Sequence, residues 1–186
     1  AYASMHDAAH HFLNGQPEGT VVDRAVIAAA GPVSGGRCKL TNAPWTLDAE
    51  RLRQSLHLRS VRLVNDLEAL GWAVPHFGAD DVVAVGEGSA VMGEPVVVIA
   101  PGTGLGLSCH LPGTAPRTVA SEAGHATLAA SDAGDVAILE MLRRRFAHVS
   151  AERVLSGVGM VNLHAVLAAQ EGQAPSVRGP RGLGAG

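Results

Sequence analysis

The strongest constraint on the fold of this chain is the alternation of short apolar runs with segments of helical periodicity. The runs at 25–30 and 96–100 each end at a Gly-Pro or Pro-Gly pair. Apolar runs of this length between turn residues are typical of buried strands, and they are far shorter than the roughly 18 residues that span a bilayer. Between the runs, apolar residues recur at helical spacing over 3–13, 47–58 and 67–74. The pattern predicts an α/β protein without a membrane span.

The residues that flank these segments predict where several elements begin and end. Asn14-Gly15 is a C-terminal stop for the first helix, and Thr46 is expected to cap the second. A further helix is predicted to begin near Asp132 and to end at the arginine run 143–145, a charge order that suits the helix dipole. Strands are predicted over 24–33, 37–42, 61–66, 81–85, 95–100 and 105–111.

Two lobes are expected, because the alternation of strands and helices gives way to a cluster of strands near residues 75–80. We predict a small α/β lobe over 1–76 and part of a large α/β lobe over 77–170. Residues 171–186 are rich in Gly and Pro and are expected to be disordered. The chain begins without Met and without the pattern of a signal peptide, so we expect further sequence in front of it.

Composition excludes several classes of partner. Of the 186 residues, 47% are apolar and 17% are charged, which is sufficient for a folded core. The net charge is −3 and Lys39 is the only lysine, so no basic face suits nucleic acid. Cys38 and Cys109 belong to no CxxC pair, which indicates neither a disulfide framework nor a zinc ribbon. A reduced, cytoplasmic location fits this cysteine usage best.

The first motif that can carry chemistry is the glycine-rich turn over 100–106. It follows an apolar strand and contains Gly102, Thr103 and Gly104, so backbone N–H groups and a hydroxyl can turn toward one anion. The turn matches neither a Walker A loop nor GxGxxG. A plain β-hairpin turn remains the alternative interpretation.

The second motif is Asn65-Asp66, at the end of the buried strand over 61–66. Open α/β sheets place ligand groups at this end of their strands. A carboxylate there can accept a hydroxyl proton, and the neighbouring amide offers a donor and an acceptor. The alternative is that the Asp66 side chain only caps the following helix.

The third group comprises Glu122, His125 and Glu152. Carboxylates accept hydrogen bonds from hydroxyls and imidazole can donate or accept, so these side chains can bind a polyol. The alternatives are that Glu152 is an exposed first-turn helix residue and that His125 is a loop histidine. The spacing of these residues is too wide to indicate a metal site.

Together, the motifs resemble a known family. The segments AGPVSGGRCKLTNAPWTLD, VRLVNDLEALGWAVP, IAPGTGLG, SEAGHATLA and HVSAERVLSGVGMVNLHAVL are similar to the bacterial glucokinase family over about residues 20–170. That family belongs to the superfold of hexokinase, actin and the heat-shock ATPases. The resemblance implies a two-lobed α/β protein with an actin-like ATPase (ribonuclease H-like) fold.

The resemblance also implies an activity and a set of site residues. The family transfers the γ-phosphoryl of ATP, with Mg²⁺ bound to the nucleotide, to the 6-hydroxyl of glucose in a cleft between the lobes. It also leads us to expect a homodimer. By motif, Asp66 corresponds to the catalytic base and Gly102, Thr103 and Gly104 correspond to the second phosphate motif. The implied sugar ligands are Asn65, Asp66, Glu122, His125, Glu152 and Asn42.

Some features of the family are not found in the sequence. A first phosphate motif of the form DxGGTxxR does not occur, and the third nucleotide element gives way to the tail after residue 170. We therefore expect a central fragment, incomplete at both ends and weak or inactive as a kinase alone. An inactive sugar-binding fragment and a related kinase for another hexose are the alternative functions. The HxxCxC-type zinc motif of neighbouring repressors does not occur either, which favours the branch without zinc.

Overall fold

The computed structural model describes residues 2–40 and 43–174 and divides into two compact units, Ala1–Ala90 and Val91–Gly186. Each unit has its own β-structure and its own hydrophobic core. The lobe boundary expected between residues 76 and 77 stays a prediction. Most of the predicted tail, residues 175–186, lies outside the described residues.

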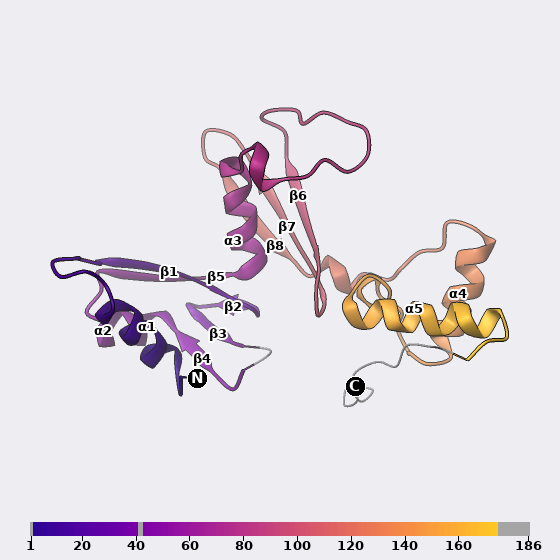
Figure 1. The fold of residues 1–186 in the computed structure, drawn as a ribbon, viewed down its shortest axis with the longest axis horizontal. Coiled ribbons are helices and arrows are strands. Elements are labelled where there is room, and N and C mark those ends of the chain that lie inside the picture. Colours follow the sequence, from indigo (N-terminus) through magenta and orange to yellow (C-terminus); the bar gives the residue numbers. More distant parts are fainter. Residues whose placement is uncertain (1, 41–42, 175–186) are drawn as a thin grey trace. The chain divides into compact units, whose positions relative to one another are not determined.

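The first unit combines a parallel strand pair with a small antiparallel sheet and three helices (Figure 1). Strand β1 pairs in parallel with β5, so that Ala29 lies opposite Asn65, and β2, β3 and β4 form the antiparallel sheet in that order. Its elements are α1 (Met5–Asn14), β1 (Arg24–Ala29), β2 (Val33–Ser34), β3 (Arg37–Lys39), β4 (Thr46–Asp48), α2 (Ala49–Ser55), β5 (Ser60–Asn65), α3 (Asp66–Ala73) and the 3-10 turns η1 (Val74–His76) and η2 (Ala79–Asp81).

The core of this unit takes one side chain from each of five elements. Burying apolar side chains from both sheets and from α2 holds β5, and therefore its C-terminal end, in place. Helix α1 contributes only partly buried packing, through Met5. The buried residues are Ala29, Cys38, Leu47, Leu52 and Leu63.

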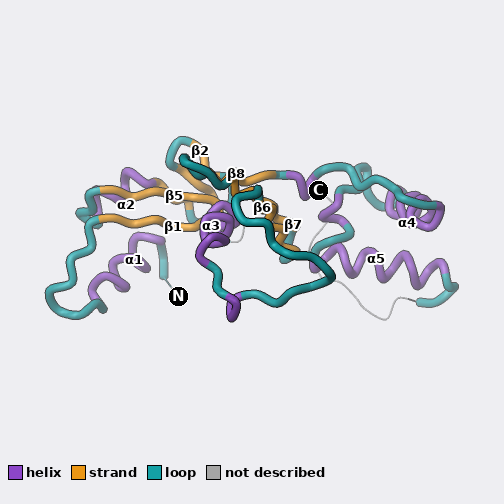
Figure 2. The backbone as a smooth tube through the Cα atoms, turned by 90° about the horizontal axis from the view of Figure 1, so that it is seen from above, coloured by secondary structure: helices purple, strands orange, loops and turns teal. Residues whose placement is uncertain are grey.

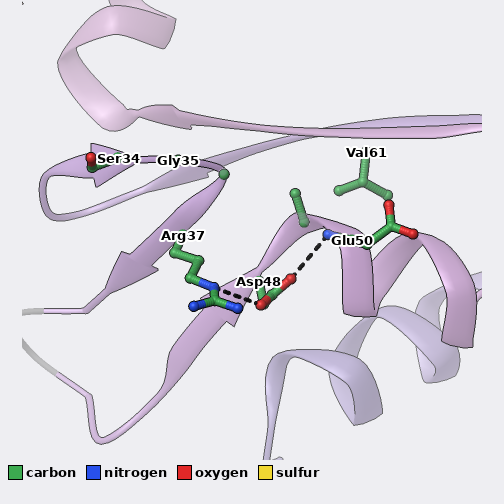
Figure 3. A pocket seen from close by; sticks show the side chains of 8 residues that line it. Ser34, Gly35, Arg37, Asp48, Glu50 and Val61 are labelled. Carbon is green, nitrogen blue, oxygen red and sulfur yellow. Dashed lines mark hydrogen bonds and ion pairs between the residues drawn. The ribbon is translucent and has the colours of Figure 1, made fainter.

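Helix α2 begins two residues later than predicted, and its cap is Asp48 rather than Thr46. One Asp48 oxygen, Oδ1, accepts from the N–H groups of Glu50 and Arg51, both at 3.1 Å. The other, Oδ2, accepts from Arg37 Nε at 2.9 Å (Figure 3). The prediction for Thr46 is wrong because that residue lies in β4, opposite Lys39. Arg37 and Asp48 are among the residues that line a surface pocket of about 490 Å³ (Figure 3).

Acid should weaken the contribution of Asp48 to stability. The hydrogen bond from the Arg51 N–H lowers the pKa of Asp48, and the Arg37 side chain lowers it further. The Asp48 carboxylate therefore stabilises the fold above about pH 4 and loses this effect as pH falls. We expect Asp48→Ala to lower the urea midpoint at pH 7, and the difference from the parent protein to shrink as the pH falls below about 4. Asp48→Asn, which keeps a capping oxygen, should retain more stability at pH 7 than Asp48→Ala. A difference between parent and Asp48→Ala that stays constant over this pH range would contradict the assignment.

The second unit is a three-stranded antiparallel sheet followed by two helices (Figures 1 and 2). The sheet order is β6-β7-β8, with Pro101 opposite Leu105 at the first hairpin. The elements are β6 (Val96–Pro101), β7 (Leu105–Leu111), β8 (Arg117–Ser121), η3 (Ala123–His125), α4 (Ala133–Arg143), η4 (Ala151–Arg153) and α5 (Gly157–Gln170).

A second core joins α4 and α5 to the segment between them. Leu142 is fully buried, and Val149 and Val154 on either side of η4 belong to the same cluster. Helix α4 begins next to Asp132, where the sequence predicts a helix start, and the Asp132 side chain caps it by accepting from the N–H of Asp135. The remaining members of the cluster are Leu139 and Val166. Because η4 carries Glu152, this core also fixes one of the candidate site residues.

Two expectations about strands differ from the structure for physical reasons. Residues 82–85 are apolar but form no strand, because no described strand pairs with them. Val83 and Val85 are accordingly 89% and 95% exposed. Strand β8 is absent from the predicted set, since its sequence, RTVAS, contains a charged residue and two polar residues and gives no apolar run. Over the part of the chain that the structure describes, no helix combines the length and the hydropathy needed to cross a membrane.

Candidate active site

Within the first unit, the side chain of the candidate ligand Asn65 joins two segments. Asn65 is the N-cap of α3, and its Oδ1 accepts from the N–H groups of Leu67 and Glu68 at 3.0 and 3.3 Å. Its Nδ2 donates to the carbonyl oxygen of Gly31 at 3.2 Å. An amide oxygen has two lone pairs and an amide nitrogen has two protons, so a single N–H remains for a ligand. Asn65, and not Asp66, is therefore the helix cap.

Asp66 is the first residue of α3 and is exposed. Its Oδ1 accepts from the N–H of Leu67 at 3.0 Å, and Oδ2 has no hydrogen bond to another described residue. Burial and, after it, the charge of Asp66 raise the pKa of the Cys38 thiol, which lies in the core of the same unit. The Asp66 carboxylate is thus exposed at the start of α3, and one of its oxygens has no hydrogen bond within the described residues that would prevent it from accepting a proton.

In the second unit, the glycine-rich turn is the three-residue connection between β6 and β7. The turn therefore has the shape of a β-hairpin turn, which is one of the two interpretations of the sequence. The N–H of Gly102 donates to Gly104 O at 2.8 Å, and the N–H of Gly157 donates to Gly102 O at 2.8 Å. The N–H groups of Thr103 and Gly104 have no hydrogen bond within the described residues. A Cβ at Gly102 would meet nothing within 4 Å. The turn therefore presents backbone donors that no described residue uses, with open space at Gly102, which fits a phosphate.

Glu152 lies directly beside this turn. Its Oε2 accepts from the N–H of Leu105, the first residue of β7, at 2.9 Å. The side chain is 30% exposed and one oxygen, Oε1, faces His125, with 4.0 Å between Oε1 and Nδ1. The predicted alternative of a solvated first-turn residue does not describe Glu152, since its carboxylate connects η4 to the hairpin.

His125 and Glu122 complete this part of the site. His125 Nε2 lies 3.7 Å from Glu122 Oε2, and the two side chains are 63% and 79% exposed. His125 therefore stands between two carboxylates, with one ring nitrogen toward each. The arrangement offers acceptor oxygens and an imidazole on one open surface, which suits a ligand with several hydroxyls.

The backbone of Leu105 contacts both η3 and η4 and directly follows the glycine-rich turn. Its N–H holds Glu152, and its carbonyl oxygen lies against Gly124, where a Cβ would overlap it. Residues 126–128 and 149–151 also bond to each other, through Ala151 N–H to Ala126 O at 3.0 Å and through the isolated bridge between Thr127 and Ser150. The structure thus brings Glu122, His125, Glu152 and the turn together within the second unit.

Sequence reasoning misses the part played by Leu105. A backbone N–H is present at almost every residue and leaves no trace in the residue type. Gly124 is the available signal, because a glycine next to candidate ligands indicates close backbone approach. The predicted contact Asn42 lies outside the described residues. Within 2–40 and 43–174, no group of three or more His, Cys, Asp or Glu side chains is arranged to hold a metal ion.

Comparison with solved structures defines the class of protein. The chain matches the crystal structure of a glucokinase from an Antarctic psychrotroph with a TM-score of 0.84 and 30% identity, over 95% of this chain and 55% of that one. The glucokinase of Balamuthia mandrillaris in complex with glucose matches with a TM-score of 0.62 and 21% identity, over 90% of this chain and 51% of that one, which supports the fold. The predicted actin-like ATPase fold is confirmed.

Comparison of sequences gives the family. The family model for glucokinase matches residues 1–183. The glucokinases of Nitrobacter hamburgensis and Paramagnetospirillum magneticum are 39% and 40% identical, over 96% and 84% of this chain. The chain belongs to the glucokinase family, as the resemblance indicated. It spans about half the length of these curated relatives, 56% and 51% respectively.

Proposed function

We propose that the protein containing this chain is a glucokinase that transfers the γ-phosphoryl of ATP to the 6-hydroxyl of glucose. The observation that carries the proposal is the position of Glu152, whose carboxylate binds the residue that follows the Gly102–Gly104 turn. A group suited to sugar hydroxyls and a turn suited to phosphate are thereby adjacent. That adjacency is what a kinase for a polyol requires.

The sugar ligands take distinct roles in this proposal. Glu122 and Glu152 accept hydrogen bonds from hydroxyls, and in Glu152 we assign this role to Oε1, the oxygen that does not bind the N–H of Leu105. His125 donates or accepts according to its tautomer. Asn65 acts only as a donor, through its remaining N–H. Asn42 is proposed as a further contact from sequence alone.

Asp66 is proposed as the general base. Its Oδ2 takes the proton of the 6-hydroxyl as that oxygen attacks the γ-phosphorus, and the bond from phosphorus to the bridging oxygen of ADP breaks. Phosphoryl transfer depends chiefly on positioning and on neutralising charge, so one aimed carboxylate is a sufficient protein base. Mg²⁺ supplies charge neutralisation on the phosphates when bound with the nucleotide.

The turn residues Gly102, Thr103 and Gly104 are proposed to bind the nucleotide phosphates through the free N–H groups of Thr103 and Gly104. A cytoplasmic location is part of the proposal, because Cys38 and Cys109 are free thiols. The homodimer implied by the family stays a prediction.

The test is glucose-dependent ADP formation by the protein expressed from its complete reading frame. Formation of glucose 6-phosphate with Mg²⁺-ATP, faster than with mannose, fructose or galactose, is the expected result. Faster transfer to one of those sugars would favour the related hexose kinase. Calorimetric glucose binding without any transfer would favour the sugar-binding alternative. A protein that neither binds glucose nor transfers phosphoryl to it would overturn the proposal.

A further inference from the structure

We infer that Gly104 is a positioning residue for glucose, although it lies in the turn assigned to phosphate. Its missing side chain leaves the space in which the Glu152 carboxylate sits. Glu152 then couples the sugar subsite to the phosphate turn. The inference rests on the proposed function, because it assigns Glu152 to the sugar.

The contact between the two residues is the first step. A Cβ at Gly104 would meet Glu152 Oε2 and would lie 3.3 Å from Cδ. Gly104 does not have a positive φ, so its backbone conformation does not require glycine. The space taken by the carboxylate is the reason for a residue without a side chain here. The same Oε2 atom holds the N–H of Leu105 at 2.9 Å.

The second step is that the backbone of Glu152 is held in place, so it cannot shift to accommodate a displaced side chain. Ser156 Oγ donates to Glu152 O at 2.8 Å, and a Cβ at Gly159 would lie 2.7 Å from the same oxygen. Ser156 is the N-cap of α5, and the N–H of Gly157 donates to Gly102 O. The turn, η4 and the beginning of α5 therefore form one bonded block. A displaced Oε2 must move the side chain, and with it Oε1.

The third step follows from the two oxygens of one carboxylate. Oε2 is committed to the turn, and Oε1 is the oxygen proposed for the sugar. A ligand that shifts the turn therefore shifts Oε1, and a sugar that orders Oε1 also orders the turn. Coupling of this kind is reciprocal: glucose and the nucleotide should raise each other's affinity by the same factor.

The experiment compares two alanine substitutions two residues apart in the same turn. Gly104→Ala places a methyl group on Oε2, whereas at Gly102 a Cβ meets nothing within 4 Å. Glucose affinity is measured by calorimetry on the full protein without nucleotide. We expect Gly104→Ala to weaken glucose binding by roughly tenfold or more, the range for losing a hydrogen bond to a charged group. Gly102→Ala should change glucose affinity by less than about twofold, whatever its effect on ATP.

A double-mutant cycle separates this role from a general loss of structure. Glu152→Asp shortens the side chain and removes the clash, so Gly104→Ala should cost much less glucose affinity in that background than in the parent. A non-hydrolysable ATP analogue should improve glucose affinity in the parent and less so in Gly104→Ala. If Gly104→Ala does not fold, the test is the effect of the analogue on glucose affinity in the Glu152→Asp variant. A smaller effect than in the parent supports the inference, and an equal effect overturns it.

The outcomes distinguish this inference from the proposed function. A parent protein that binds no glucose overturns both. If the parent binds glucose and Gly104→Ala binds it with equal affinity, only the role of Gly104 is overturned. The same holds if Gly104→Ala and Gly102→Ala change glucose affinity by equal amounts. Additive effects in the double-mutant cycle would also contradict it.

Discussion

Replacing Asp66 by Asn is expected to lower turnover of glucose by roughly 10²–10⁴-fold, the usual contribution of a general base. Glucose binding should stay within about tenfold, because the amide keeps the shape of the carboxylate. The structure supports this separation. The amide oxygen of the variant can still accept from the N–H of Leu67, the bond that Asp66 Oδ1 makes at 3.0 Å, so the start of α3 is preserved. What is lost is the second oxygen as a proton acceptor.

The measurement is a steady-state comparison of kcat and KM for glucose, with calorimetric binding beside it. Asp132→Asn serves as a control, since Asp132 is a helix cap in the second unit and Asn also caps helices well. Turnover by Asp66→Asn within a factor of about three of the parent would remove Asp66 from the catalytic role. A loss of glucose binding as large as the loss of turnover would make it a ligand and not the base.

Leu142→Ala is expected to destabilise the protein by about 2–5 kcal/mol, the range for emptying the position of a buried leucine. Leu142 is 0% exposed and packs in the cluster that contains Val149 and Val154. These two valines flank η4, so the cavity should also loosen Glu152. We therefore expect weaker glucose binding together with the lower stability, although Leu142 is not among the candidate ligands.

Urea denaturation gives the stability change, and Leu167→Ala is the matched control. Leu167 lies in α5 and is 40% exposed, so its truncation removes less buried surface and should cost clearly less. Equal losses for the two leucines would mean that the core does not centre on Leu142. A destabilised variant with unchanged glucose affinity would separate the core from the site.

Much of the fold could be predicted because apolar runs correspond to β1, β5, β6 and β7, and those of β1, β6 and β7 end near Gly or Pro. Prediction fails where strand formation depends on a partner that sequence does not reveal. Residues 82–85 have the residue types of a strand and no described strand beside them, whereas β8 pairs along β7 with little apolar content. Caps were predictable to within two residues, since Thr46 and Asp48 are both good capping types.

The candidate site was predictable as a set of residue types and not as a geometry. Asn65 and Glu152 were both identified, but the sequence could not show that each uses one part of its side chain for structure. Those bonds go to backbone groups of Gly31 and Leu105, which are distant in sequence and whose residue types do not signal the contact. The distinction decides the chemistry, because it leaves Asn65 a single N–H and Glu152 a single oxygen, Oε1, without a structural hydrogen bond.

The double anchorage of Leu105 has a consequence for how the sequence can vary. An inserted residue in the turn 102–104 would shift the Leu105 peptide away from Glu152 on one side and from Gly124 on the other. The opposite end of β7 carries no such restraint: residues 112–116 form an exposed or half-buried turn, and a Cβ at Gly113 would meet nothing within 4 Å. Loop length should therefore be free to vary at 112–116 and fixed at 102–104, so that the turn at one end of β7 tolerates insertions and deletions while the turn at the other end does not.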